Sequence, residues 1–470
     1  MILVPMLCLQ LLRASKMVYN EMRGSPAVAL AAGQRIYQGI EVTGPLFCVV
    51  YGPITYLIYA PMVWFREPKS ALLMGSFISL VFYSSPLIYM LLHFRKEPRR
   101  SSLSTAAMAL LFFAFTLTSP ALAYSSTYVH ADGPMLGLAG LATLVLYFHH
   151  ESTGWIPPLA CALLTVLAVG TKQTALPLML GVPVIAWYLD NRRFSIRYLT
   201  GAAIFGSSGV GAIALLIHRP SDVVLNMWTQ ASGQFEWAKV PVTLSALHTN
   251  LLPLLFTGMA ITIAALAVPP RIPWREFRTL LIFPAIALAL LPGSLLAMFF
   301  VNGDQNALSP FVYFALLSVL MLVYASVARG FPTANYWTAA TLTAAGLLVP
   351  MAMEGLRPAA LREALQPGRS EIAFAYARRH PGQVYFPDHP LAEYLAEGRF
   401  YHSDWGVGGY LIARIPISAD AIWKYIPSRA FYVAYPSLAP GYYLLPFVAP
   451  HGRLHAISEL PGFEVYEIER

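Results

Sequence analysis

Residues 70–94 read SALLMGSFISLVFYSSPLIYMLLHF, without a single Asp, Glu, Lys or Arg. A membrane-spanning helix needs about 20 mostly apolar residues, so this run is long enough to cross the hydrocarbon core of a bilayer. Comparable apolar runs occupy 45–65, 103–123, 133–149, 155–171, 174–189, 198–217, 250–269, 279–301, 307–328 and 334–353. With the apolar stretch 1–12, interpreted as the end of a first membrane helix, the pattern predicts a polytopic α-helical membrane protein with about 11–12 hydrophobic segments.

The composition agrees with a membrane protein. Of the 470 residues, 57% are hydrophobic and 11% are charged, whereas a soluble globular protein carries about 25% charged residues. This excludes a cytosolic enzyme, a secreted disulfide scaffold and a disordered chain. Cys8, Cys48 and Cys161 lie in apolar runs, so they indicate neither a disulfide framework nor a zinc site. The net charge of +8 is attributed to loop arginines that orient the chain, and no nucleic-acid partner is expected.

The polar residues divide the chain into two predicted domains. Residues 1–353 form a transmembrane domain, whereas 354–470 have an ordinary soluble composition. Within this second part, 369–380 has a helical pattern. Runs typical of β-strands lie at 383–386, 430–433 and 463–468. We therefore expect a C-terminal α/β domain.

Short basic loops predict the orientation, because Lys and Arg concentrate on the cytoplasmic side. These loops lie at 95–100, 192–197 and 271–278. Alternation from them places these segments outside: 124–132, 172–173, 219–247, 302–306 and 354–470. Strict alternation also places 13–44 in the cytoplasm, whereas the functional interpretation below requires it outside. Either the 45–65 run is re-entrant or one run nearby fails to cross.

The few acidic residues of the outer segments are candidates for a shared site, because charge is costly near a membrane. They are Glu21, Glu41, Asp132, Asp222, Glu236 and Asp304. Asp132, in YVHADGP (128–134), heads an apolar helix, where it is also a plausible N-cap. Lys172, in VGTKQT (169–174), interrupts two apolar runs. Its side chain either extends to the membrane interface or binds an anionic headgroup such as a phosphate.

The order of these features resembles the GT-C glycosyltransferases, in particular bacterial relatives of the dolichyl-phosphate-mannose protein mannosyltransferases and of the aminoarabinose lipid A transferase. The resemblance covers most of 13–350 and rests on the order of short motifs. It implies that Glu21 is the catalytic base, at a place where the family often has Asp-Glu and this chain has Asn20-Glu21. Asp132 matches the second acidic motif, and Tyr51 begins the Tyr-x-Pro motif.

The resemblance also implies a chemistry. A sugar would pass from a polyprenyl-phosphate donor to a hydroxyl of a lipid, glycan or protein, with inversion, at the outer face of the cell membrane. The residues predicted to bind the donor are Lys172, Tyr51, Arg23, His130, Asp304 and Asn306. A divalent metal is left open, with Asp132 as the ligand if there is one, and no other cofactor is implied.

Two other classes of membrane protein remain as alternatives. A transporter or lipid flippase is expected to have charged groups at mid-membrane depth and paired broken helices, whereas this chain offers only Lys172, beside a membrane edge. A polymerase or ligase of surface polysaccharide typically has a large outer loop rich in arginine and histidine. The 219–247 loop contains too few of these residues to favour that reading.

Overall fold

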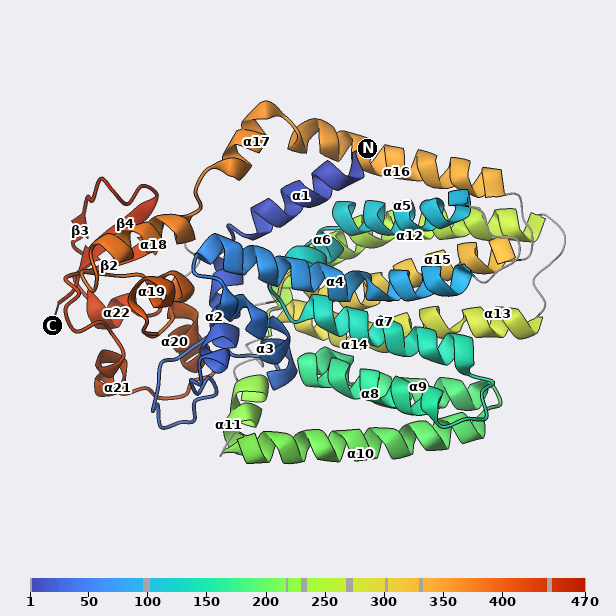
Figure 1. Cartoon of the computed structure of the whole chain (residues 1–470), viewed down its shortest axis with the longest axis horizontal. Coiled ribbons are helices and arrows are strands. Elements are labelled where there is room, and N and C mark those ends of the chain that lie inside the picture. Colours follow the sequence, from blue (N-terminus) through green and yellow to red (C-terminus); the bar gives the residue numbers. More distant parts are fainter. Residues whose placement is uncertain are drawn as a thin grey trace.

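The computed structural model describes residues 2–95, 102–216, 219–229, 235–267, 274–300, 303–328, 333–437 and 442–469. The chain forms a long helical bundle with a smaller α/β domain at one end (Figure 1). Parts of the predicted basic loops, 96–100 and 271–273, lie outside the described residues.

The bundle is built from apolar helices of different lengths. They are α4 (Pro68–Phe94), α5 (Ser102–Thr118), α7 (Asp132–His149), α8 (Ile156–Thr171), α9 (Leu178–Tyr188), α10 (Arg192–Leu216), α12 (Val240–Ala267), α14 (Ile282–Phe299), α15 (Ser309–Ala328) and α16 (Thr333–Gly355). Each overlaps an apolar run of the sequence, so the polytopic α-helical fold is confirmed.

The number of spans is smaller than the number of apolar runs. Within the described residues, five helices are long and apolar enough to cross a membrane, or up to seven if each of two bent pairs is one span. One bent pair consists of α5 and α6 (Pro120–Thr127), which meet at 100°. Other runs form shorter apolar helices, among them α1 (Leu3–Ala14) and α8. Composition alone therefore overstates how many helices reach full spanning length.

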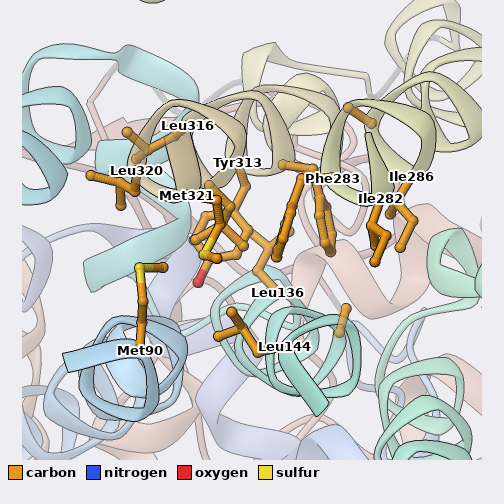
Figure 2. Close-up of a cluster of buried hydrophobic side chains, with 14 of the residues drawn as sticks. Met90, Leu136, Leu144, Ile282, Phe283, Ile286, Tyr313, Leu316, Leu320 and Met321 are labelled. Atoms are coloured by element: carbon orange, nitrogen blue, oxygen red, sulfur yellow. The ribbon is translucent and has the colours of Figure 1, made fainter. Parts of the chain in front are cut away.

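The core of the bundle holds α7 in place. Figure 2 shows part of it, where apolar side chains of α4, α7, α14 and α15 meet. Met90 and Leu136 contribute from α4 and α7, and Phe283 from α14. Tyr313 of α15 is also buried there, and its hydroxyl donates to the Tyr83 carbonyl at 2.8 Å. This packing fixes the helix whose first residue is Asp132.

The 45–65 run does not form one spanning helix. Its first part is extended, and α3 (Pro53–Tyr59) and the short helix η1 (Ala60–Trp64) follow. The segment before it, which contains α2 (Val18–Ala31), lies at the end of the bundle that carries the C-terminal domain (Figure 1). The Leu46 amide, for example, donates to His402 Nδ1 at 2.9 Å. Neither helix of this run is among those long enough to cross a membrane, which favours the alternatives in which one apolar run does not span.

The opposite end of the bundle carries described basic residues. It contains the C-terminal end of α4, the start of α10, and α13 (Trp274–Leu280) (Figure 1). Arg278 of α13 lies 3.2 Å from Asp190, which precedes α10. The described residues of the predicted basic loops and the C-terminal domain therefore lie at opposite ends of the bundle, as the orientation predicted from these loops requires.

The C-terminal part combines short helices with a small sheet. The helices are α17 (Pro358–Leu365), α18 (Arg369–Arg379), α19 (Pro390–Glu397), α20 (Asp404–Ile412), α21 (Ala419–Lys424) and α22 (Leu445–Val448). The strands are β1 (Val384–Tyr385), β2 (Tyr432–Pro436), β3 (Leu454–His455) and β4 (Phe463–Glu467). The sheet has the order β1-β2-β4-β3, with β1 and β2 parallel and the other pairs antiparallel. The predicted helix and the predicted strand runs are confirmed; β3 had no clear sequence signal.

Both faces of this sheet are covered. Val433 and Tyr435 of β2 pack into one apolar cluster, whereas Ala434 between them packs into another. Successive strand residues point to opposite faces, so β2 is apolar throughout instead of alternating. The domain docks through α19 onto α2 and through α18 onto α4. It therefore lies directly over the segment in which the sequence places Glu21 and Arg23.

Candidate active site

Asp132 is fully buried at the start of α7. The predicted N-cap role is wrong: Ala131 is the N-cap, and no side chain caps the helix there. Gly133 permits a close approach at this point, because a Cβ there would lie 2.6 Å from the Ser125 carbonyl oxygen. Because the Asp132 carboxylate does not cap α7, it is available to other side chains.

Three side chains bind this carboxylate. Lys172 Nζ donates to Oδ1, Asn306 Nδ2 donates to Oδ2 at 2.8 Å, and His130 Nδ1 lies 2.7 Å from Oδ2. They come from the end of α8, from the short helix η5 (Gln305–Leu308) and from the loop before α7. Adding Tyr51, which contacts His130, we call these five residues the Asp132 cluster. All five were predicted from the sequence, and the structure brings them together.

His130 links Asp132 to Tyr51. Its Nδ1 accepts from the Asp132 backbone amide at 3.2 Å and lies 2.7 Å from Asp132 Oδ2. Its Nε2 shares a hydrogen bond with the Tyr51 hydroxyl, with the two atoms 2.5 Å apart. The His130 carbonyl is held in turn by the Tyr59 hydroxyl at 2.7 Å. Burial lowers the pKa of His130 to about 3, so the ring is neutral at physiological pH.

Lys172 reaches Asp132 because α8 ends at Thr171. The Lys172 backbone is extended, with φ −145° and ψ 128°, which turns its side chain away from the helix. Its Nζ lies 5.7 Å from the centre of the Tyr51 ring. The Thr171 carbonyl accepts from the Thr55 hydroxyl of α3 at 2.7 Å. The end of α8 and the beginning of α3 are thus joined, which places the two predicted motifs side by side.

Arg23 adds a second cation at the edge of the cluster. Its guanidinium binds the Tyr124 hydroxyl and lies 5.5 Å from the centre of the Tyr19 ring. Burial raises the pKa of Tyr51 well above its usual value, and the nearby Arg23 charge opposes that rise. Tyr51 therefore lies within electrostatic reach of both Arg23 and Lys172.

Glu21 lies outside this cluster, although it is only two positions before Arg23. It is fully buried against the C-terminal domain. Its Oε2 lies 2.7 Å from His389 Nδ1, and its Oε1 accepts from the Ala392 amide in the first turn of α19 at 2.6 Å. A carboxylate there also interacts favourably with the helix dipole. The role of Glu21 as base stays a prediction, and both of its oxygens are occupied.

Asn20 and His389 are residues that the sequence reasoning did not assign. Asn20 Oδ1 accepts from the Val129 amide at 3.1 Å, and its Nδ2 donates to the Ala14 carbonyl at 2.6 Å. It thereby ties α2 to the loop that carries His130. Asn20 could have been found from the sequence, because it stands next to Glu21 where the resembling family often has Asp-Glu. No local signal pairs His389 with Glu21, because they are 368 positions apart.

Asp304 is predicted at the site and lies at its border. It is exposed, and its Oδ1 accepts from the Gln305 amide at 2.6 Å as the N-cap of η5. The other acidic residues of the outer segments have separate partners. Asp222 pairs with Arg35, Glu41 with Arg219 at 3.9 Å, and Glu236 with Lys239 at 3.8 Å. These three residues were candidates for a shared site, and the structure gives each of them its own ion pair instead.

A metal ion does not fit the surroundings of Asp132. Its oxygens are bound by the Lys172 ammonium, the His130 ring and the Asn306 amide. A metal would have to displace a cation that is already paired there. Within the part of the chain that the structure describes, no group of at least three His, Cys, Asp or Glu side chains has a metal-binding arrangement.

No protein-family model matches the chain, and no curated protein matches it. Among solved structures it is similar to ArnT from Cupriavidus metallidurans bound to undecaprenyl phosphate, with a TM-score of 0.58 over 99% of this chain and 97% of that one. This chain has the ArnT fold. The sequence identity is 13%, so the similarity shows the fold alone. The apo state of ArnT from the same organism matches with a TM-score of 0.46 at 14% identity, over 95% of this chain and 92% of that one.

Proposed function

We propose that this protein is an integral-membrane glycosyltransferase that moves a sugar from a polyprenyl-phosphate donor to an acceptor hydroxyl, with inversion. The observation that carries the proposal is the buried Asp132–Lys172 pair, with Arg23 nearby, at the end of an ArnT-like bundle that faces the C-terminal domain. The ArnT structure in which undecaprenyl phosphate is bound has this fold. This supports a lipid-borne donor.

The two cations account for donor binding. Lys172 is held by Asp132, so its ammonium is oriented before the substrate arrives. An ammonium has three donors, and the bond to Asp132 uses one of them. The remaining N–H groups of Lys172 and the Arg23 guanidinium are suited to the phosphate. They would stabilise the charge that develops on it as the glycosidic bond breaks.

Asp132 and Asn306 act in this proposal by holding the cation in place. Asp132 directs the Lys172 side chain through the bond to its Oδ1, and Asn306 holds the second carboxylate oxygen at 2.8 Å. Asp304, which caps the same short helix, lies at the exposed border where an acceptor would enter. Glu21 stays a candidate base whose carboxylate must first leave its bonds to α19.

The orientation follows from the basic end of the bundle. Arginine-rich loops remain in the cytoplasm, so the Asp132 cluster and the C-terminal domain are placed on the extracytoplasmic side of the cell membrane. A polyprenyl tail would stay in the bilayer while its sugar reaches the acceptor there. The paired charges support a transferase over a transporter, because Asp132 and Lys172 lie at helix ends instead of mid-helix.

The test uses the full chain in lipid nanodiscs with radiolabelled undecaprenyl-phosphate monosaccharides and an envelope lipid and glycan extract. We expect one donor to be consumed, with label passing to the extract and undecaprenyl phosphate released. Asp132→Asn should remove this turnover. Full-length protein that binds undecaprenyl phosphate but consumes no donor would contradict the proposal. In sealed proteoliposomes, labelled donor that crosses the bilayer unchanged would instead favour a transporter.

A further inference from the structure

A cavity of about 250 Å³ lies among α7, α9, α10 and α13, at the end of the bundle opposite the C-terminal domain (Figure 1). Its lining includes His150, Asp190, Asn191 and Arg278. Asn191 Nδ2 donates to the His150 carbonyl, so the turn before α10 is tied to the residue that follows α7. Pockets that enclose drug-sized ligands measure roughly 300–1,000 Å³. This cavity is smaller, and it therefore suits a compact polar group.

Arg278 is the cation in the lining of this cavity. Its guanidinium donates to the Tyr188 carbonyl and lies 3.2 Å from Asp190 Oδ2. Its Nε is buried and, within the described residues, has no hydrogen-bond partner. The Asp190 side chain is 83% exposed, and an ion pair with so exposed a member is weak. An anion in the cavity can therefore compete with Asp190 for the guanidinium.

Three arginines at this end of the bundle lie over aromatic rings. From guanidinium carbon to ring centre, the pairs are Arg278 with Tyr188 at 4.8 Å, Arg192 with Trp187 at 4.7 Å and Arg197 with Trp155 at 4.9 Å. All three rings are exposed. Exposed Trp and Tyr rings of membrane proteins concentrate at the level of the lipid headgroups. The rings therefore place these arginines at the level of the lipid phosphates.

The charge around the cavity favours an anion. Among the described residues of these segments, four arginines and two acids leave an excess of two positive charges: Arg192, Arg193, Arg197 and Arg278 against Glu151 and Asp190. Two of the arginines also begin α10, whose first turn contains no acidic residue. Cations at the start of a helix are unfavourable, because the helix dipole is positive there. A bound anion would offset both effects.

We propose that this cavity and the three arginine–aromatic pairs bind the phosphodiester headgroup of an anionic phospholipid in the cytoplasmic leaflet. This inference uses the orientation proposed above and does not use the transferase activity. A planar guanidinium can donate to two phosphate oxygens at once, which suits Arg278 and Arg192 to a phosphodiester. Basic pockets between membrane helices on the cytoplasmic side bind anionic headgroups in this way.

Inorganic phosphate offers the same charge to the arginines. It has no acyl chains, however, and gains nothing from the exposed rings of Trp155 and Trp187. A phospholipid places its headgroup beside the arginines while its chains remain in the bilayer next to these rings. The position of the rings therefore favours a lipid over a soluble anion.

The experiment titrates the full chain in detergent with phosphatidylglycerol and with phosphatidylcholine of the same acyl chains, and follows bound lipid by native mass spectrometry. We expect one phosphatidylglycerol per chain, bound at least ~10-fold more tightly than phosphatidylcholine. Arg278→Gln and Arg192→Gln should each raise the Kd for phosphatidylglycerol by ~10-fold. Arg192 is exposed on the surface of α10, so its variant keeps the test valid if Arg278→Gln fails to fold.

Two further variants separate the cavity from general surface charge. Arg95→Gln removes one exposed positive charge from the end of α4, on the same side of the bundle, and should change the Kd less than ~3-fold. Asp190→Asn removes the carboxylate that competes for Arg278 and should lower the Kd about 2- to 5-fold. Asparagine tolerates the left-handed backbone of this position, where φ is 65°. A purely structural role of Asp190 predicts no gain in lipid affinity.

Four outcomes would overturn the proposal. They are equal Kd values for the two lipids, equal losses in Arg278→Gln and Arg95→Gln, unchanged or weaker binding in Asp190→Asn, and displacement of phosphatidylglycerol by millimolar inorganic phosphate. The last result would assign the cavity to a soluble anion. Each measurement follows lipid binding and none follows donor turnover. A chain that consumes no donor but binds phosphatidylglycerol as expected would therefore refute the proposed function and leave this site in place.

Discussion

Two buried clusters contain carboxyl side chains, and these carboxyls are stabilised in different ways. In the Asp132 cluster, a cation and hydrogen-bond donors keep the carboxylate charged. The second group, which we call the Glu21 cluster, consists of Glu21, Asp388, His389 and Glu393, all at most 1% exposed. Burial raises the pKa of Asp388 and Glu393 well above usual values, and the Glu21 charge adds to both rises. Burial therefore favours the protonated form of these two acids.

The contrast distinguishes the candidate active site from the contact between the helical bundle and the C-terminal domain. Within the described residues, Asp388 Oδ1, His389 Nε2 and Glu393 Oε2 have no hydrogen-bond partner, and the ion pair of the Glu21 cluster joins Glu21 to His389 instead of to a Lys or Arg. That cluster joins α2 to α19 and thereby docks the C-terminal domain. The Asp132 cluster, built from the ends of α7 and α8 and the start of α3, holds a directed ammonium. A charged, oriented group is what phosphate chemistry needs, whereas protonated acids suit a domain contact.

The largest effect is expected from Lys172→Met. The change leaves the Asp132 carboxylate buried without its cation, which should cost about 3–5 kcal/mol of folding free energy. Turnover of the lipid-phosphate sugar should fall below detection. The measurements are chemical unfolding in detergent and the donor assay. Asp132→Asn/Lys172→Met is the matched control: it should recover most of the stability and none of the turnover. A single variant as stable as wild type would show that the pair is not buried as described.

Gly52→Ala is expected to act through geometry. A Cβ at Gly52 would lie 1.9 Å from the Gly170 carbonyl oxygen, so the start of α3 and the end of α8 must separate. Tyr51 and Lys172 would then move apart, and a displacement of about 1 Å can cost ~100-fold in rate. Gly181→Ala in α9 is the matched control, because its Cβ meets nothing within 4 Å. Equal kcat values for the two variants would remove the claim that this contact positions the site.

Glu21→Gln tests which cluster Glu21 serves. Glutamine can still accept from the Ala392 amide but loses the charge that faces His389. We expect the C-terminal domain to become more sensitive to limited proteolysis, with a cost of about 1–3 kcal/mol, and kcat to fall less than ~10-fold. The sequence-based role as catalytic base requires a loss of ~1,000-fold or more with normal proteolysis. The two outcomes exclude each other.

The sequence predicts the bundle well because apolar length and basic loops are local signals. It also places Asp132, Lys172 and Asn306 in outer segments, and the structure joins them. It does not reveal that 45–65 forms no helix long enough to cross, since hydropathy ignores the break at Gly52-Pro53. Nor does it reveal the partner of Glu21, because that contact joins α2 to a domain far along the chain. The order of the motifs indicated that a carboxylate takes part in catalysis. Only the fold shows which carboxylate is paired with a Lys, namely Asp132 with Lys172.

The smallest effect is expected from His402→Asn, at the docking contact between the C-terminal domain and the segment before α3. His402 Nδ1 accepts from the Leu46 amide at 2.9 Å, and Nε2 is 3.2 Å from the Ala421 carbonyl oxygen. Asparagine can replace the first bond but not the second, so the loss near pH 7 should be about 1 kcal/mol. Thermal unfolding of the full chain measures it.

At acid pH, the His402→Asn variant should become more stable than the wild type, the reverse of their order near pH 7. Burial lowers the pKa of His402 to about 4 from 6.5, so between these values the unfolded chain binds more protons than the native one. The stability that a neutral His402 contributes is complete above pH 6.5 and is lost as the pH falls toward 4. Asp404, whose pKa burial raises to about 6, changes in the opposite sense but is present in both proteins. The stability of His402→Asn should therefore fall less steeply than that of wild type between pH 6.5 and 4. Parallel curves would show that His402 takes up protons equally in the native and unfolded chains, and that the contact with Leu46 is not what acid breaks.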